Sequence, residues 1–131
     1  MRVLIVEDDL TSRLLMLKLM ERYGDCHVAV NGREALQAVT AALDGGQPYD
    51  LVCLDIMMPE MDGQTALRGI RAAEEARGIP RGRRVRVVMT TALGHEASIT
   101  TAIQGQCDGY LVKPIDMTRL VALLQQWQLI P

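Results

Sequence analysis

Residues 51–55 form a run of four apolar residues that ends in a carboxylate, Leu-Val-Cys-Leu-Asp. A strand that is apolar on both faces is typical of a parallel sheet covered by helices on both sides. In such sheets, ligands bind beyond the carboxyl ends of the strands. Because a carboxylate in an apolar core is unfavourable, we expect Asp55 to lie at that edge of the sheet.

Apolar strands and amphipathic helices alternate along the chain, which favours an α/β fold with a parallel sheet. We expect strands at residues 2–7, 26–30, 50–55, 86–90 and 109–112. Helices are expected at 10–23, 33–43, 63–76, 96–104 and after Asp116. Gly24 suits a helix C-cap, and Asp62 and Asp116 suit helix N-caps. The inward face of the last helix is expected to carry Leu120, Leu123, Leu124 and Trp127.

Polar side chains follow four of the five expected strands. Glu7 ends the first and Asp8 follows it, Asp55 ends the third, Thr91 follows the fourth and Lys113 follows the fifth. Neighbouring carboxylates raise one another's pKa unless a cation lies among them, and an all-oxygen cluster suits Mg²⁺. With the lysine neutralising phosphate oxygens and the hydroxyl donating a hydrogen bond, the set predicts a phosphoryl site whose nucleophile is Asp55.

Four motifs, in order, resemble those of the receiver domains of two-component response regulators. They are residues 6–9 (Val-Glu-Asp-Asp), 54–63 (Leu-Asp-Ile-Met-Met-Pro-Glu-Met-Asp-Gly), 89–92 (Met-Thr-Thr-Ala) and 109–114 (Gly-Tyr-Leu-Val-Lys-Pro). The resemblance covers essentially the whole chain. It implies a flavodoxin-like (βα)5 doubly wound sandwich with strand order 2-1-3-4-5, which places the first and third strands side by side.

The resemblance also implies a role for each matching residue. Asp55 would accept the phosphoryl group. Mg²⁺ would be held by Asp8 directly, by Glu7 through water, by Asp55 itself and by the backbone carbonyl of Met57. An apolar side chain at Met57 would also position an attacking water poorly.

Three further residues match the family's switch positions and its phosphoryl-binding lysine. Thr91 would be the switch hydroxyl, because a small residue follows it, and Tyr110 would be the switch aromatic. Lys113 would bind the phosphoryl group, and its bond to Pro114 is a candidate for the cis geometry. Asp9 is expected to serve the first helix rather than the metal, because an acidic group is favourable near a helix N-terminus.

These roles imply a signalling switch rather than an enzyme. A sensor histidine kinase or a histidine phosphotransfer protein would phosphorylate Asp55, and a downstream protein target would bind at the face of the fourth helix, fifth strand and fifth helix. The chain would be a monomer or a phosphorylation-dependent dimer. Two alternatives are a haloacid-dehalogenase-type phosphohydrolase, whose second Asp is replaced here by Met57, and a structural adaptor that never turns over phosphate.

Composition sets further bounds. We expect residues 1–131 to be one receiver domain without an output domain. A net charge of −2 does not indicate direct binding of nucleic acid. Neither a leader nor an apolar run of about 20 residues is evident, so we expect a cytoplasmic protein that does not enter a membrane. Three widely spaced cysteines, Cys26, Cys53 and Cys107, fit reduced thiols. His27 and His95 have no ligand spacing and receive no metal role.

Half of the 14 basic residues lie between positions 68 and 86. They are Arg68, Arg71, Arg77, Arg81, Arg83, Arg84 and Arg86. We favour a solvated, flexible connection between helix and strand, because charge runs are usually solvated. The alternative is a docking patch for an acidic partner or for nucleic acid, although no aromatic residue interleaves the patch.

Overall fold

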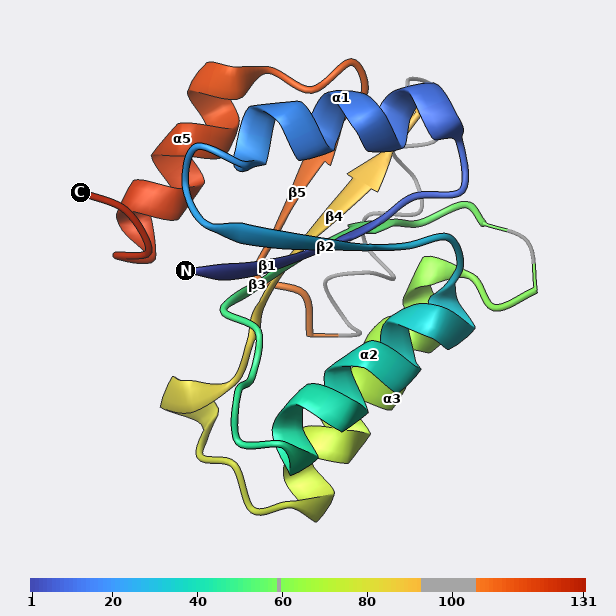
Figure 1. Ribbon diagram of the computed structural model, residues 1–131, viewed down its shortest axis with the longest axis vertical. Coiled ribbons are helices and arrows are strands. Elements are labelled where there is room, and N and C mark those ends of the chain that lie inside the picture. Colours follow the sequence, from blue (N-terminus) through green and yellow to red (C-terminus); the bar gives the residue numbers. More distant parts are fainter. Residues whose placement is uncertain (59, 93–105) are drawn as a thin grey trace.

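The computed structural model describes residues 1–58, 60–92 and 106–131, and its five strands form one parallel sheet (Figure 1). The strands are β1 (Arg2–Val6), β2 (Asp25–Ala29), β3 (Leu51–Asp55), β4 (Arg86–Thr91) and β5 (Gly109–Val112). They lie in the order β2-β1-β3-β4-β5. The α/β class, the strand order and the strand positions, to within one residue, are confirmed.

The described helices are α1 (Leu10–Met20), α2 (Gly32–Asp44), α3 (Gly63–Ala76) and α5 (Met117–Gln126), and a 3₁₀ turn, η1 (Arg81–Arg83), precedes β4. The helix expected at 96–104 lies outside the described residues. Asp62 and Asp116 cap α3 and α5 as predicted, by accepting hydrogen bonds from the backbone N–H groups of Thr65 and Thr118. Each cap of this kind is worth about 1 kcal/mol of stability.

The predicted end of the first helix is wrong. Helix α1 ends at Met20 with Glu21 as its C-cap, three residues before the predicted end, and Gly24 is not the cap. Gly24 instead allows two backbone segments to meet, because a Cβ there would lie 2.0 Å from the Met1 carbonyl oxygen. That carbonyl accepts a hydrogen bond from Asp25 at 3.0 Å, which brings β2 alongside β1.

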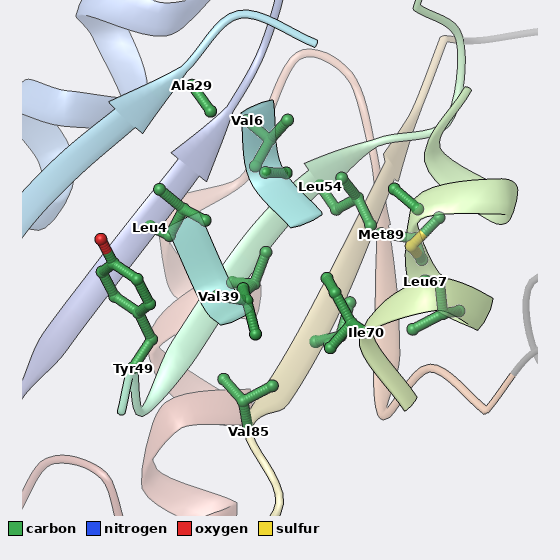
Figure 2. Close-up of a cluster of buried hydrophobic side chains, with 14 of the residues drawn as sticks. Leu4, Val6, Ala29, Val39, Tyr49, Leu54, Leu67, Ile70, Val85 and Met89 are labelled. Carbon is green, nitrogen blue, oxygen red and sulfur yellow. The ribbon is translucent and has the colours of Figure 1, made fainter. Parts of the chain in front are cut away.

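The sheet buries an apolar cluster on each face. Helices α2 and α3 cover one face, where Leu4, Val39, Leu54 and Ile70 pack together (Figure 2). Helices α1 and α5 cover the other face, and Figure 1 shows these two pairs of helices on opposite sides of the sheet. The last helix buries Leu120 and Leu124 and partly buries Leu123 and Trp127, as predicted. Strand β3 is buried along its whole length, which explains its apolar sequence.

The three cysteines are free thiols, as expected, and Cys53 is fully buried in β3. No helix in the described part of the chain has the length and apolar character needed to cross a membrane.

The arginine-rich segment is only partly a solvated connection. Arg71 in α3 is 8% exposed, and its guanidinium contacts Glu74 and Asp108, each at 2.8 Å. It also donates to the backbone carbonyls of Val85 and Gln106. Arg71 therefore ties α3 to the starts of β4 and β5, whereas Arg81, Arg83 and Arg77 are exposed.

Candidate functional site

The sheet brings the predicted site residues together at the carboxyl ends of its strands. Glu7 follows β1, Asp55 ends β3 and Lys113 follows β5, although these positions are far apart in the sequence. Strands β1 and β3 are neighbours, with Val6 opposite Leu54, so the two carboxylates lie side by side. Both are buried, at 5% exposure each.

Lys113 bridges these two carboxylates. Its ammonium Nζ donates to Oε2 of Glu7 at 2.5 Å and to Oδ2 of Asp55 at 3.2 Å. The backbone of Lys113 is also fixed, because its N–H donates a hydrogen bond to the Thr91 carbonyl at 2.7 Å. The Lys113–Pro114 peptide bond is cis, as predicted.

Burial and the neighbouring charges shift the pKa values of Glu7 and Lys113. Burial raises the pKa of Glu7, the hydrogen bond from Lys113 opposes that rise, and the neighbouring Asp55 adds to it. Burial by itself would lower the pKa of Lys113, but the hydrogen bond to Glu7 and the charge of Asp55 together raise it above its ordinary value. The lysine therefore stays protonated and can neutralise an anion.

The backbone around Asp55 fixes its carboxylate. The N–H of Met57 donates to Oδ1 of Asp55 at 3.2 Å, while the Met57 side chain is 55% exposed. Gly63 packs against the same strand end, where a Cβ would lie 2.2 Å from the Asp55 carbonyl oxygen. The N–H of Gly63 donates to Ile56, which closes the loop after β3. Gly63 is therefore needed for the position of Asp55.

The acidic residues have the donor set of a magnesium site. Carboxylate oxygens of Glu7, Asp8 and Asp55 lie within 4.8 Å of one another. An octahedral Mg²⁺ with ligands at about 2.1 Å spans about 4.2 Å between opposite ligands. Small side-chain movements therefore suffice to bring these oxygens around one ion. Asp8 is exposed, so water can complete the coordination shell.

Asp9 is excluded from this cluster by its role in α1. Its side chain accepts a hydrogen bond from the Ser12 N–H at 2.8 Å and caps the helix. That backbone hydrogen bond lowers the pKa of Asp9 below its ordinary value. The expectation that Asp9 serves the helix is confirmed.

The two threonines that end β4 belong to opposite faces of the sheet. Thr91 is fully buried, and its neighbour two residues earlier, Met89, packs on the α2–α3 side. Thr90 lies opposite Asp55 in register and lines an apolar pocket beside α1. Tyr110 lies opposite Met89 on β5 and is 36% exposed. The switch roles of Thr91 and Tyr110 stay predictions.

Sequence reasoning missed two residues that support the site. Arg13 donates from Nη1 to the backbone carbonyl of Glu7 at 3.0 Å, and Gly63 makes room for Asp55. A glycine in the first turn of a helix, where it lowers stability relative to alanine, was a signal for a steric role. Arg13 gave no signal in the sequence, because a basic residue on a helix at the protein surface is ordinary.

Comparison with known proteins identifies the arrangement. Residues 3–125 match the family model described as the response regulator receiver domain. The chain is 35% identical over 127 residues to the sensor histidine kinase GacS of Pseudomonas protegens, covering 96% of this chain and 13% of the kinase. It is 30% identical over 125 residues to the chemotaxis protein CheY of Bacillus subtilis, covering 95% of each chain.

A solved structure shares the fold. It is the receiver domain of the sensor histidine kinase PA1611 from Pseudomonas aeruginosa, with a magnesium ion coordinated in its active site cleft. The TM-score is 0.78 at 27% sequence identity, over 96% of this chain and 95% of that one. The chain thus spans about an eighth of the GacS kinase but nearly the full length of the CheY relative and of this receiver domain.

Proposed function

The chain belongs to the response regulator receiver domain family, and we propose that it is a phosphorylation switch whose acceptor is Asp55. The observation that carries the proposal is the bridge from the Lys113 ammonium to both Glu7 and Asp55 at the carboxyl edge of the sheet. A nucleophilic carboxylate next to a fixed cation and a divalent-metal donor set is the arrangement that phosphoryl transfer requires.

In the proposed reaction, an Asp55 carboxylate oxygen attacks the phosphorus of a phosphohistidine in line. The new O–P bond forms as the P–N bond breaks, and the electron pair leaves with the imidazole nitrogen. Lys113 neutralises the oxygens of the transferring group, and Thr91 donates a hydrogen bond to the phosphorylated product. Magnesium bound by Glu7, Asp8, Asp55 and the Met57 carbonyl would neutralise developing charge on the phosphoryl oxygens.

The proposed donors are a sensor histidine kinase or a histidine phosphotransfer protein, which the kinase relatives support. The phosphoryl group adds up to two negative charges, so it biases an equilibrium between two conformations. Thr91 would move toward that group and Tyr110 would move from its exposed position. The face that includes β5 and α5 would then gain or lose affinity for a downstream protein.

The chain would catalyse its own phosphorylation and dephosphorylation rather than turn over an external substrate. We propose residues 1–131 as one receiver domain. The hydrolase alternative needs a second carboxylate two residues after Asp55, and Met57 stands there. The adaptor alternative predicts that neither Mg²⁺ nor phosphoryl group binds.

The test is intact mass spectrometry after incubation with acetyl phosphate and Mg²⁺, with Asp55→Asn run beside the wild type. We expect one phosphoryl adduct on the wild type and none on the variant. An equal adduct on both proteins would refute the assignment of Asp55. Sustained release of phosphate from a small ester such as p-nitrophenyl phosphate would favour the hydrolase instead.

A further inference from the structure

A polar depression of about 340 Å³ lies at the end of the sheet opposite to Asp55, where β4 and β5 begin. Its walls include Arg71, Arg81, Arg84, Arg86, Cys107 and Asp108. The described residues that line the depression take no part in the Asp55 site, so the depression can have a separate role. Its volume is in the range of pockets that hold a small ligand.

The carboxylate within this depression already accepts three hydrogen bonds. Asp108 accepts from Arg71 at 2.8 Å through Oδ2 and from Arg86 at 3.1 Å through Oδ1. Its Oδ2 also accepts from the Val87 N–H. Glu74 supplies a second carboxylate to Arg71. The charge of Arg71 is therefore balanced, and Asp108 has little left for another cation.

Arg81 and Arg84 are not balanced in this way. Within the described residues, neither guanidinium has a carboxylate within 4.0 Å. Nε of Arg84 donates to the Ile79 carbonyl at 3.1 Å, which fixes the plane of its guanidinium. Its two terminal amino groups have no hydrogen-bond partner in the part of the chain that the structure describes. They are free to bind a ligand.

The backbone that carries these arginines is ordered by its own hydrogen bonds. The N–H of Arg83 donates to Pro80 at 2.8 Å, and that of Arg84 donates to Arg81 at 3.3 Å, which forms the 3₁₀ turn η1. Positions 81 and 84 therefore face the depression, while Arg83, in the same turn, does not line it. The guanidiniums of Arg81 and Arg84 therefore belong to one common depression.

We propose that this depression binds the diphosphate group of a small molecule. A guanidinium binds phosphate oxygens through two parallel hydrogen bonds, so two unpaired guanidiniums that line one depression can each take one phosphate of a linked pair. A single carboxylate would pair with only one of the two guanidiniums. Among the described residues that line the depression none is aromatic, so they offer no stacking platform for the bases of a nucleic acid. The ligand is therefore recognised by its charged groups.

The chain carries its own reporter for this binding. Its single tryptophan, Trp127, lies beside the site, with the Arg86 guanidinium carbon 5.8 Å from the ring centroid. The experiment titrates the full chain with inorganic pyrophosphate, at constant ionic strength and without Mg²⁺, and follows tryptophan emission. Calorimetry on the same samples detects binding that leaves the emission unchanged.

We expect saturable binding of pyrophosphate that Arg81→Gln and Arg84→Gln each weaken by about tenfold, as the loss of a charge-assisted bidentate contact predicts. Arg83→Gln is the matched control and should bind like the wild type. Lys113→Gln should also leave binding unchanged, because the Asp55 site is not involved. Arg84→Lys keeps the charge but loses the fork, so it should weaken binding by an intermediate factor.

Different ligands separate the possible sources of the diphosphate. Equal binding of ADP and pyrophosphate would identify the diphosphate itself as the ligand, and tighter binding of ADP would add a nucleoside contact. Equal binding of AMP or inorganic phosphate would overturn the proposal, as would the absence of saturable binding. An equal loss in Arg83→Gln would indicate diffuse attraction and would also overturn it. Binding of an oligoglutamate peptide without binding of pyrophosphate would replace it with an acidic protein partner.

Discussion

Nζ of Lys113 lies 2.5 Å from Oε2 of Glu7, although 106 positions separate the two residues in the sequence. The same ammonium reaches Asp55 at 3.2 Å, so one cation bridges carboxylates that follow two neighbouring strands. A cation between two carboxylates offsets their mutual repulsion. It also contacts one oxygen of each of two carboxylates in the candidate metal cluster, so we expect the lysine to compete with Mg²⁺ for them.

Replacement of Lys113 by alanine is expected to change the affinity for Mg²⁺ and the rate of phosphorylation in opposite directions. The affinity for Mg²⁺ should rise several-fold, because the carboxylates lose the ammonium that neutralises them. The rate of phosphorylation by acetyl phosphate should fall by about 100-fold, because a fixed positive charge next to the transferring group is lost. Calorimetry measures the affinity for Mg²⁺, and intact mass spectrometry at successive times measures the rate of phosphorylation.

Lys18→Ala is the matched control, since Lys18 is exposed on α1 and away from the site. Both quantities should stay at their wild-type values in that protein. Weaker Mg²⁺ binding in Lys113→Ala than in the wild type would contradict the role of the ammonium as a competitor.

Gly63→Ala is expected to disturb Asp55 through the backbone. The added Cβ would lie 2.2 Å from the Asp55 carbonyl oxygen, so the strand end must shift. Overpacking of this kind costs about 1–3 kcal/mol of unfolding free energy, and phosphorylation should slow as well. Urea unfolding measures the first effect. Gly82→Ala, where a Cβ meets nothing within 4 Å, should match the wild type within about 0.5 kcal/mol. Wild-type stability in Gly63→Ala would contradict the steric argument.

Glu74→Gln is expected to lower stability strongly without touching the Asp55 site. Glu74 is 1% exposed, pairs with Arg71 and accepts the Val85 N–H at 2.7 Å. Loss of this carboxylate should cost about 2 kcal/mol, less than the loss of the sole partner of a buried charge, because Arg71 keeps its ion pair with Asp108. Glu75→Gln, on the exposed neighbour, should cost less than about 0.5 kcal/mol. Equal urea midpoints for the two variants would show that the Arg71 network contributes little.

The thiols give a prediction about pH. Burial raises the pKa of Cys53 to about 12, and burial also raises those of Cys26 and Cys107. Only the thiolate reacts with iodoacetamide, so at pH 8 the folded protein should leave Cys53 unmodified. In urea all three cysteines should react, and peptide mass mapping identifies which ones do. Rapid labelling of Cys53 in the folded protein would show that β3 opens locally.

Much of the site could be predicted because its residues stand at the carboxyl ends of neighbouring strands. Once β1 and β3 are recognised as parallel neighbours, Glu7 and Asp55 must meet, and Lys113 follows from the position of β5. The N-caps Asp62 and Asp116 were also readable, because a cap is a local interaction. The switch roles of Thr91 and Tyr110 rest on the family resemblance and stay predictions.

The errors have a common origin in contacts that are distant along the sequence. Gly24 has the local signature of a helix C-cap, but its actual constraint comes from the backbone of Met1. Arg71 appeared to be one charge among many in a solvated run, because one of its two carboxylate partners, Asp108, lies 37 positions later. The need for glycine at position 63 likewise depends on the carbonyl of Asp55. Local pattern can mark a residue such as Gly63 as unusual for its position, but it does not identify the distant partner.

The most direct test of the central claim locates the phosphoryl group on the chain. After incubation with acetyl phosphate and Mg²⁺, borohydride reduces an aspartyl phosphate to homoserine, and peptide mass mapping finds the modified position. We predict homoserine at position 55 alone, with none in protein that was not phosphorylated. Homoserine at position 8, or unchanged aspartate at both positions in protein that carries a phosphoryl adduct, would contradict the assignment of Asp55 as acceptor.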